Sequence, residues 1–240
     1  MDYLVFGDVD SRDYNVWVYP SEIDSAPQRE YSEIVIAGRN GTLTMDGGRY
    51  ENIDHVYQGI IFSNTALSDL VNFRNALTAQ IDYKRLTDSI NTDEFYEARF
   101  MEEFKPVLTE NRDAVKFDIK FNRKPQRFLV SGETAIVFTS GGTVTNPTAF
   151  EAKPLLKVTG YGTLGVGDRS VIITGTAGQV IYIDCEIMEA WSMSGSAIIP
   201  RNDYVQYVGN KFPVLASGVN GISMSGNITR VEVTPRWWRV

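Results

Sequence analysis

Apolar and polar residues alternate over many short stretches of this chain, with the period of two that is typical of half-buried β-strands. The clearest example lies at residues 115–122, where Val115, Phe117, Ile119 and Phe121 alternate with charged or amide side chains. This pattern predicts a strand of an antiparallel sheet that turns one face toward the core.

A hairpin is predicted in the first fifty residues. Ile34 and Ile36 lie in a second alternating run, and Asn40-Gly41, a dipeptide that favours hairpin turns, follows them. Gly47-Gly48 offers a further turn shortly afterwards.

The second half of the chain contains short apolar runs separated by segments with glycine. These runs predict strands at residues 155–158, 170–174, 180–187 and 230–233. Short strands at this spacing are typical of a β-sandwich or jelly roll. The chain is therefore predicted to be mainly β.

One segment, from Thr65 to Gln80, has helical periodicity instead. Its apolar residues at near-helical spacing are Leu67, Leu70, Val71, Ala76 and Leu77. Asn64 or Thr65 can cap the start of the helix, and Asp69 suits its first turn. We expect this helix to cover one face or end of the sheet in the first half.

Charged residues are distributed unevenly along the 240 residues. Residues 1–127 hold 22 acidic and 15 basic side chains, a net charge of −7, whereas residues 128–240 hold 8 of each. The change follows the polar stretch Arg123-Lys-Pro-Gln-Arg127. Because the length has room for two domains, we predict one at residues 1–127 and a second at residues 128–240.

Composition argues against several classes of protein. The net charge of −7 disfavours a broad phosphate-binding surface. No apolar run is long enough for a membrane-spanning helix, and the acidic first ten residues do not resemble a secretory signal. Cys185 and His55 are the only cysteine and histidine, so an intramolecular disulfide is excluded and most histidine-dependent catalysis is not expected.

A glycine motif invites comparison with nucleotide-binding proteins. Gly160, Gly162 and Gly165 match the pattern G-x-G-x-x-G, and Asp184 lies 19 residues after the third glycine. A dinucleotide site needs a helix directly after the glycines, because the start of that helix binds the pyrophosphate. A strand-like run at residues 171–174 follows instead, so we interpret this segment as a hairpin loop.

Acidic groups are the other candidates for chemistry. Asp8, Asp10 and Asp13 are spaced like calcium ligands but lack the glycine of such a loop, so a solvated turn is expected. Asp93-Glu94 and Glu102-Glu103 are two pairs of adjacent residues. The side chains of each pair would point to opposite faces of a strand, so they could not share one site as general acid and base. Catalytic carboxylates from distant segments are left open by these patterns.

No nucleophile motif points to His55, because Gly-x-Ser-x-Gly is absent. We expect His55 at the surface or in a hairpin, and Cys185 as a buried residue of the strand at 180–187. The sequence therefore predicts no catalytic, cofactor-binding or metal-binding residue. Aromatic residues, 12% of the chain, are expected mainly in the core and in subunit interfaces, and an exposed tryptophan near Trp191 would be the mark of a sugar site.

Several motifs of the second half together resemble a known family. The run from Phe212 to Ile222 reads F-P-x-L-x-x-G-x-N-x-I, Gly226 follows it, and the segment Val231 to Trp238 ends in P-R-W-W. This order and spacing resemble the C-terminal region of distal tail proteins of bacteriophages with long non-contractile tails. Residues 38–50, the helix near Leu67, and Phe117-Asp-Ile-Lys-Phe121 ahead of Lys124-Pro-Gln126 are similar to the N-terminal domain of that family.

The resemblance implies an architecture. The N-terminal domain would be a β-barrel or sandwich-like structure with one helix and a protruding hairpin, and the C-terminal domain a galectin-like β-sandwich. Six copies would form a ring through their N-terminal domains at the tip of the virion tail, after assembly in the host cytoplasm. The ring would join the tail tube protein to the baseplate and the receptor-binding proteins of the tip.

The resemblance also implies what this protein would not do. It would have no enzymatic activity, cofactor or membrane insertion, and DNA would only pass through its channel. Two alternatives stay open on the residues alone. The first is a carbohydrate-binding module that recognises a host cell-surface glycan, and the second, disfavoured by the single histidine and cysteine, is a glycosidase or peptidoglycan hydrolase.

Overall fold

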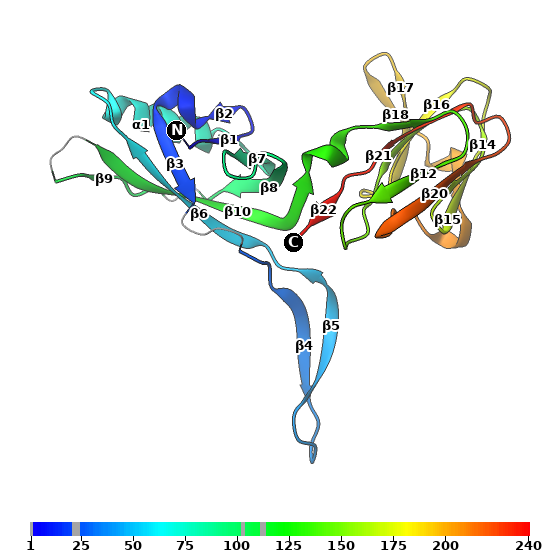
Figure 1. Cartoon of the computed structure of the whole chain (residues 1–240), viewed down its shortest axis with the longest axis horizontal. Helices are drawn as coiled ribbons and strands as arrows, with labels where there is room; N and C mark the ends of the chain where they lie inside the picture. Colours follow the sequence, from blue (N-terminus) through cyan, green and yellow to red (C-terminus); the bar gives the residue numbers. More distant parts are fainter. Residues whose placement is uncertain (1, 21–24, 102–103, 111–113) are drawn as a thin grey trace. The chain divides into compact units, whose positions relative to one another are not determined.

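A computed structural model describes residues 2–20, 25–101, 104–110 and 114–240. The chain divides into two compact units, residues 1–127 together with Val240 and residues 128–239, which are called unit 1 and unit 2 below. Strands dominate both units, as the alternating pattern predicts (Figure 1).

Unit 1 is built on one curled sheet in which the strand order is β2-β1-β7-β8-β10-β6-β3, with β9 also paired to β10. The strands are β1 (Leu4–Phe6), β2 (Val9–Asp10), β3 (Val16–Pro20), β6 (Ile53–Ile61), β7 (Lys84–Asp88), β8 (Glu94–Phe100), β9 (Val107–Leu108) and β10 (Val115–Leu129). A short 3-10 helix, η1 (Ser11–Tyr14), links β2 to β3.

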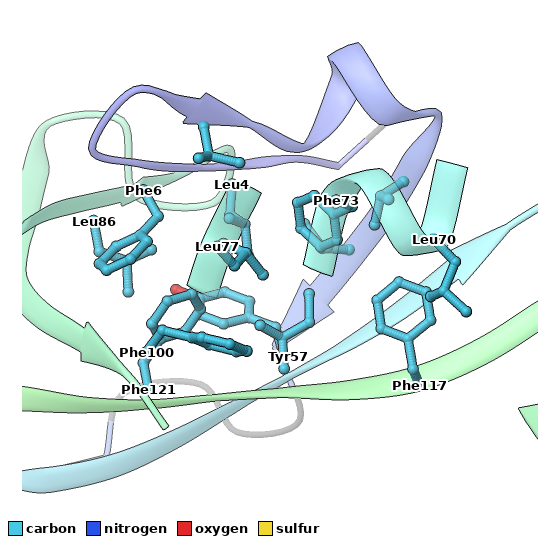
Figure 2. Packing of buried hydrophobic residues seen from close by; sticks show 14 of the residues in the cluster. Leu4, Phe6, Tyr57, Leu70, Phe73, Leu77, Leu86, Phe100, Phe117 and Phe121 are labelled. Carbon is cyan, nitrogen blue, oxygen red and sulfur yellow. The ribbon is translucent and has the colours of Figure 1, made fainter. Parts of the chain in front are cut away.

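Strand β10 confirms the strand predicted at residues 115–122 and is longer than expected. It pairs antiparallel with β6, so that Ile119 lies opposite Tyr57 and Phe121 opposite His55. The strand continues through Arg123–Arg127, a polar stretch that the alternating pattern did not assign to a strand. The face of β10 that holds Phe117 and Phe121 lies under the unit 1 core (Figure 2).

Helix α1 (Ala66–Thr78) confirms the predicted helix, with Thr65 as its N-cap. Its buried side chains are Ala66, Leu70, Phe73 and Leu77, which pack on the sheet (Figure 2). Two of the apolar residues at helical spacing, Leu67 and Val71, lie outside this stripe and are 63% and 42% exposed. Each follows a buried residue by one position, which places it about 100° round the helix from the buried stripe.

A separate two-stranded sheet forms the predicted hairpin. Strands β4 (Arg29–Val35) and β5 (Thr42–Tyr50) pair with each other and, within the described residues, with no other strand. Figure 1 shows them as a long arm, a name used here for residues 29–50. The loop between the strands spans residues 36–41, so Asn40-Gly41 forms its end rather than the whole turn.

The second turn expected at Gly47-Gly48 was wrong, because both residues lie inside β5. Pairing shifts there, from Arg29 opposite Tyr50 to Tyr31 opposite Asp46. Gly48 has φ +74°, a conformation that glycine adopts easily, and it serves an irregularity in the strand rather than a reversal of the chain.

Unit 2 is a sandwich of two antiparallel sheets. The first has the order β11-β21-β13-β16-β17-β18 and the second the order β12-β20-β14-β15-β19. The strands are β11 (Ile136–Phe138), β12 (Gly142–Asn146), β13 (Leu155–Thr159), β14 (Gly162–Val166), β15 (Arg169–Ile173), β16 (Val180–Asp184), β17 (Glu189–Ser194), β18 (Ala197–Pro200), β19 (Val205–Tyr207), β20 (Gly218–Met224) and β21 (Arg230–Thr234), and β22 (Trp238–Arg239) ends the chain.

Side chains from both sheets of unit 2 meet in one core. Val158, Ile183 and Val231 of the first sheet join Leu164 and Ile222 of the second. The four strands predicted from short apolar runs are all present, as β13, β15, β16 and β21. Strand β16 ends at Asp184, three residues before the predicted end.

Candidate assembly surfaces

The arm has one apolar face and one mainly polar face. The strand register places Ile34 opposite Leu43 and Ser32 opposite Met45, so these four side chains lie on the same face. Ile34, Leu43 and Met45 are 41%, 43% and 55% exposed. Contiguous apolar surface of this kind on a soluble protein marks a contact with another molecule.

Ion pairs stiffen the root of the arm. The Arg29 guanidinium pairs with Asp46, and Arg49 pairs with Glu30. Hydrogen bonds from Arg29 and from the backbone N–H of Gly48 lower the pKa of Asp46 to about 2. These pairs are exposed, so they fix geometry more than they stabilise the chain.

The root is also tied to the body of unit 1. Arg123 Nη2 donates to the carbonyl oxygen of Ser25 at 3.1 Å. Asn52 Nδ2 donates to Tyr83 Oη at 2.7 Å and to Asn122 Oδ1 at 2.8 Å. Bonds from β10 and from Tyr83, just before β7, therefore converge where the arm begins.

A second exposed patch lies on the sheet of unit 1, on the side away from α1. Trp17 and Tyr19 of β3 are 46% and 42% exposed, and Phe62, just beyond β6, is 58% exposed. The rings of Trp17 and Phe62 meet edge to face, with centroids 6.4 Å apart. Trp17, Tyr19 and Phe62 are called the aromatic patch below.

The closing segment of unit 2 contains the P-R-W-W residues. Arg236 donates from Nη1 and Nη2 to the two carboxylate oxygens of Asp184 at 2.6 and 2.7 Å. Trp238 donates from Nε1 to the carbonyl oxygen of Glu151 at 2.9 Å, and Trp237 is buried in the core. This ion pair joins residues far apart in sequence, and no spacing signal points to it.

The F-P-x-L-x-x-G-x-N-x-I run also has a structural role. Asn220 is buried, and its amide donates to the carbonyl oxygens of Ala216 and Gly218 while its Oδ1 accepts the N–H of Ala216. A second buried amide, Asn146, donates to the carbonyl oxygen of Leu215 at 3.0 Å. The motif therefore fixes the chain path into β20.

The glycine motif lies where the chain passes from one sheet of unit 2 to the other. A strand follows it, as the run at residues 171–174 predicts. Gly160 and Gly162 connect β13 in one sheet to β14 in the other, and β14 then forms a hairpin with β15. A Cβ on Gly162 would lie 2.1 Å from the carbonyl oxygen of Ser225, and φ there is +143°. Strand β15 occupies the place where a dinucleotide site needs a helix.

Trp191 is engaged with its neighbours in the sheet. Its ring stacks on Tyr182 with centroids 5.7 Å apart and planes 7° from parallel, and its other cross-strand neighbour is Pro200. A sugar stacks on an open ring face, so this arrangement gives little support to a glycan site at Trp191.

The acidic residues considered as candidate ligands or catalytic pairs are either bound in ion pairs or too differently placed to act together. Asp10 caps η1 and pairs with Arg12 at 2.5 Å. Glu94 is buried and bonded to Arg127, whereas Asp93 is exposed, so this pair cannot act together. Glu102-Glu103 lies outside the described residues. Within the described parts of the chain, no three His, Cys, Asp or Glu side chains gather into a group that could hold a metal ion.

The expectation of an exposed His55 was wrong. His55 is 4% exposed in β6, and its ring meets that of Tyr57 edge to face at 4.7 Å. The two residues are two positions apart on one strand, so both point into the core. Cys185 is buried as expected, just after β16, and burial raises the pKa of its thiol to about 12.

Comparison with solved structures defines the fold. No protein-family profile matches the chain, and no curated protein matches it in sequence. The crystal structure of the SPP1 Dit protein, described as a paradigm of the hub adsorption apparatus in phages that infect Gram-positive bacteria, superposes with a TM-score of 0.71 at 12% identity over 100% of both chains. The chain has the fold of a Dit protein.

Two structures of the phage P2 baseplate in its activated conformation, one with Ca and one with Sr, share this fold at lower similarity. Their TM-scores are 0.54 and 0.53 at 10% identity, and each covers 97% of this chain. The superposed regions include both units of this chain. Within the described residues, no helix is long and apolar enough to cross a membrane.

Proposed function

We propose that this protein is the structural hub of a phage tail tip. In this role copies of the chain form a closed ring, six in number, that joins the tail tube to the baseplate and receptor-binding proteins. The single observation behind the proposal is the full-length similarity to SPP1 Dit, in which both units match at once. The sequence motifs in both halves support the same family.

The arm supports assembly through unit 1. A closed ring uses a heterologous interface, in which one surface docks on a different surface of the next copy. An exposed hairpin with an apolar face is suited to reach a neighbour, and Ile34, Leu43 and Met45 supply that face. We place the protein at the virion tail tip, after assembly in the host cytoplasm, with DNA only passing through the ring.

Light scattering on a sizing column, followed by negative-stain imaging of the peak, tests this proposal. Six copies of a 26.9 kDa chain weigh about 161 kDa, and images should show a ring with a central channel. A monomer at every concentration, alone and with the cognate tail tube, would contradict the ring.

The role as a hub also implies that the protein is not an enzyme. The solved structures with the same fold are described as hub and baseplate proteins. Incubation with purified cell wall should release no sugar or peptide. The carbohydrate-binding alternative was expected near Trp191, and the stacking of Trp191 on Tyr182 does not favour a sugar site at that residue.

A further inference from the structure

We infer that the aromatic patch is the surface that receives the arm of a second copy of this chain. This inference rests on the proposed ring and names the two surfaces that would meet in it. The apolar face of the arm, with Ile34, Leu43 and Met45, would lie against Trp17 and Phe62 of the neighbour.

Both surfaces are open in a single chain. Trp17 and Phe62 are 46% and 58% exposed, and Ile34 and Met45 of the arm are 41% and 55% exposed. The arm therefore does not cover the aromatic patch of its own chain. Two unlike apolar surfaces on one protein are what a head-to-tail contact requires.

The strand register shows that the aromatic patch is one continuous surface. Trp17 lies opposite Ile60 and Tyr19 opposite Gln58 in the pairing of β3 with β6. Phe62 follows Ile60 by two positions and touches Trp17 edge to face. Tryptophan and tyrosine with polar groups at the rim are typical of the centre of a protein–protein interface.

The edge of β3 favours docking through side chains over strand addition. The N–H of Val18 is already bonded to the carbonyl oxygen of Asp2 at 3.2 Å, and Pro20 has no N–H to offer. An edge strand blunted in this way resists addition of another strand. A partner would therefore pack on the rings that project from the face of the sheet.

Charge favours a second copy as the occupant. Residues 1–127 have a net charge of −7, so two copies can meet only through surfaces that carry little negative charge. The outer half of the arm, residues 34–45, has Arg39 as its only charged side chain. Beside the aromatic patch, Asp118 of β10 lies opposite Gln58, the neighbour of Tyr19, and is exposed. An apolar arm with a single cation thus meets an aromatic patch with a carboxylate at its rim.

A mixing experiment tests the assignment. The arm variant is Ile34→Asp with Leu43→Asp, and the patch variant is Trp17→Asp with Phe62→Asp. Each variant alone should be a monomer of about 27 kDa, because each lacks one half of the interface. A 1:1 mixture should form a complex of about 54 kDa and no ring, since the intact arm of one variant can dock on the intact patch of the other.

A matched control changes an exposed apolar cross-strand pair elsewhere. Met193→Asp with Ile198→Asp alters residues that are 46% and 67% exposed in unit 2 and should leave wild-type assembly unchanged. Circular dichroism verifies that each variant is folded. If the arm variant unfolds, a chain whose arm is shortened between Ser32 and Met45 replaces it in the mixture. If the patch variant unfolds, the single change Tyr19→Asp replaces it.

The outcomes separate this inference from the proposed function. A wild-type ring together with a mixture that stays monomeric would overturn the assignment of the aromatic patch and leave the hub intact. Assembly of the patch variant at wild-type mass would overturn it equally. A monomeric wild type and a monomeric mixture would count against both.

Discussion

Arg236 and Asp184 form a two-pronged ion pair that closes unit 2. The two N–H···O distances are 2.6 and 2.7 Å, and the Asp184 side chain is only 8% exposed. Arg236 has φ +59°, a strained conformation for a residue with a side chain. The pair therefore holds the last segment of the chain in place against a local backbone cost.

We expect Arg236→Met to lower the free energy of unfolding of unit 2 by about 2–4 kcal/mol, because Asp184 would stay buried without its partner. Urea unfolding followed by tryptophan fluorescence measures the change. The matched control is Arg230→Met, which breaks an ion pair to Glu232 at the surface and should leave the midpoint within error. Equal effects of the two changes would contradict a special role for Arg236.

The same pair predicts a dependence on pH. Burial acts to raise the pKa of Asp184, but the hydrogen bond from Arg236 and that from the N–H of Glu186 outweigh it and hold the pKa below its ordinary value. An unfolded aspartate titrates at about 3.9, so the stabilisation is complete above that pH and is lost as the pH falls through the folded pKa. The stability difference between wild type and Asp184→Asn should therefore shrink between pH 7 and pH 3. An unchanged difference would contradict this account.

The glycine motif gives a prediction about packing. A Cβ at Gly162 would lie 2.1 Å from a backbone oxygen, so Gly162→Ala should cost about 3 kcal/mol or more. Gly178→Ala is the matched control, because Gly178 also has positive φ, +78°, but open space around it, and it should cost about 1 kcal/mol. Equal costs at both sites would show that strain alone, without the close approach to Ser225, sets the need for glycine.

Local patterns predicted much of the secondary structure. The alternation at Val115–Phe121 located β10, and the helical spacing from Thr65 located α1 within two residues at each end. Both signals depend on which side chains face the core, and this is visible in a short window. The same windows did not distinguish the exposed Leu67 from the buried Leu70, because a neighbouring apolar residue on a helix can be buried or exposed without changing the pattern.

Long-range contacts could not be predicted in this way. Asp184 attracted attention only for its distance from a glycine motif, and its partner Arg236 lies 52 residues away. His55 was expected at the surface or in a hairpin because no nucleophile motif points to it, but the register of β6 points it inward beside Tyr57. Such placements depend on strand pairing, which a single sequence does not reveal.

The stack of Trp191 on Tyr182 predicts a stabilising role. Trp191→Ala should lower the free energy of unfolding by about 1–2 kcal/mol, because a cross-strand aromatic pair is lost. Met193→Ala, on the same strand and 46% exposed, should have a much smaller effect.

A glycan array should give the same result for wild type and Trp191→Ala. Glycan binding that disappears in this variant would revive the sugar-binding alternative.

Truncation of the arm separates folding from assembly. The cut should fall between Ser32 and Met45, which lie opposite each other, so that both strands shorten equally and an Asn-Gly turn can close them. The removed residues, 33–44, are exposed, so the free energy of unfolding should change by no more than about 1 kcal/mol. We expect a folded monomer in light scattering, because the surface that reaches the neighbour is gone.

The matching control for that truncation shortens an exposed hairpin of unit 2, between Met193 and Ile198, which are also cross-strand partners. This variant should assemble like the wild type, because nothing in the proposed ring depends on that turn. A normal ring from the arm truncation would place the subunit contact elsewhere in unit 1. Loss of the ring from both truncations would instead mean that assembly tolerates no change in these hairpins and that the arm has no particular part in it.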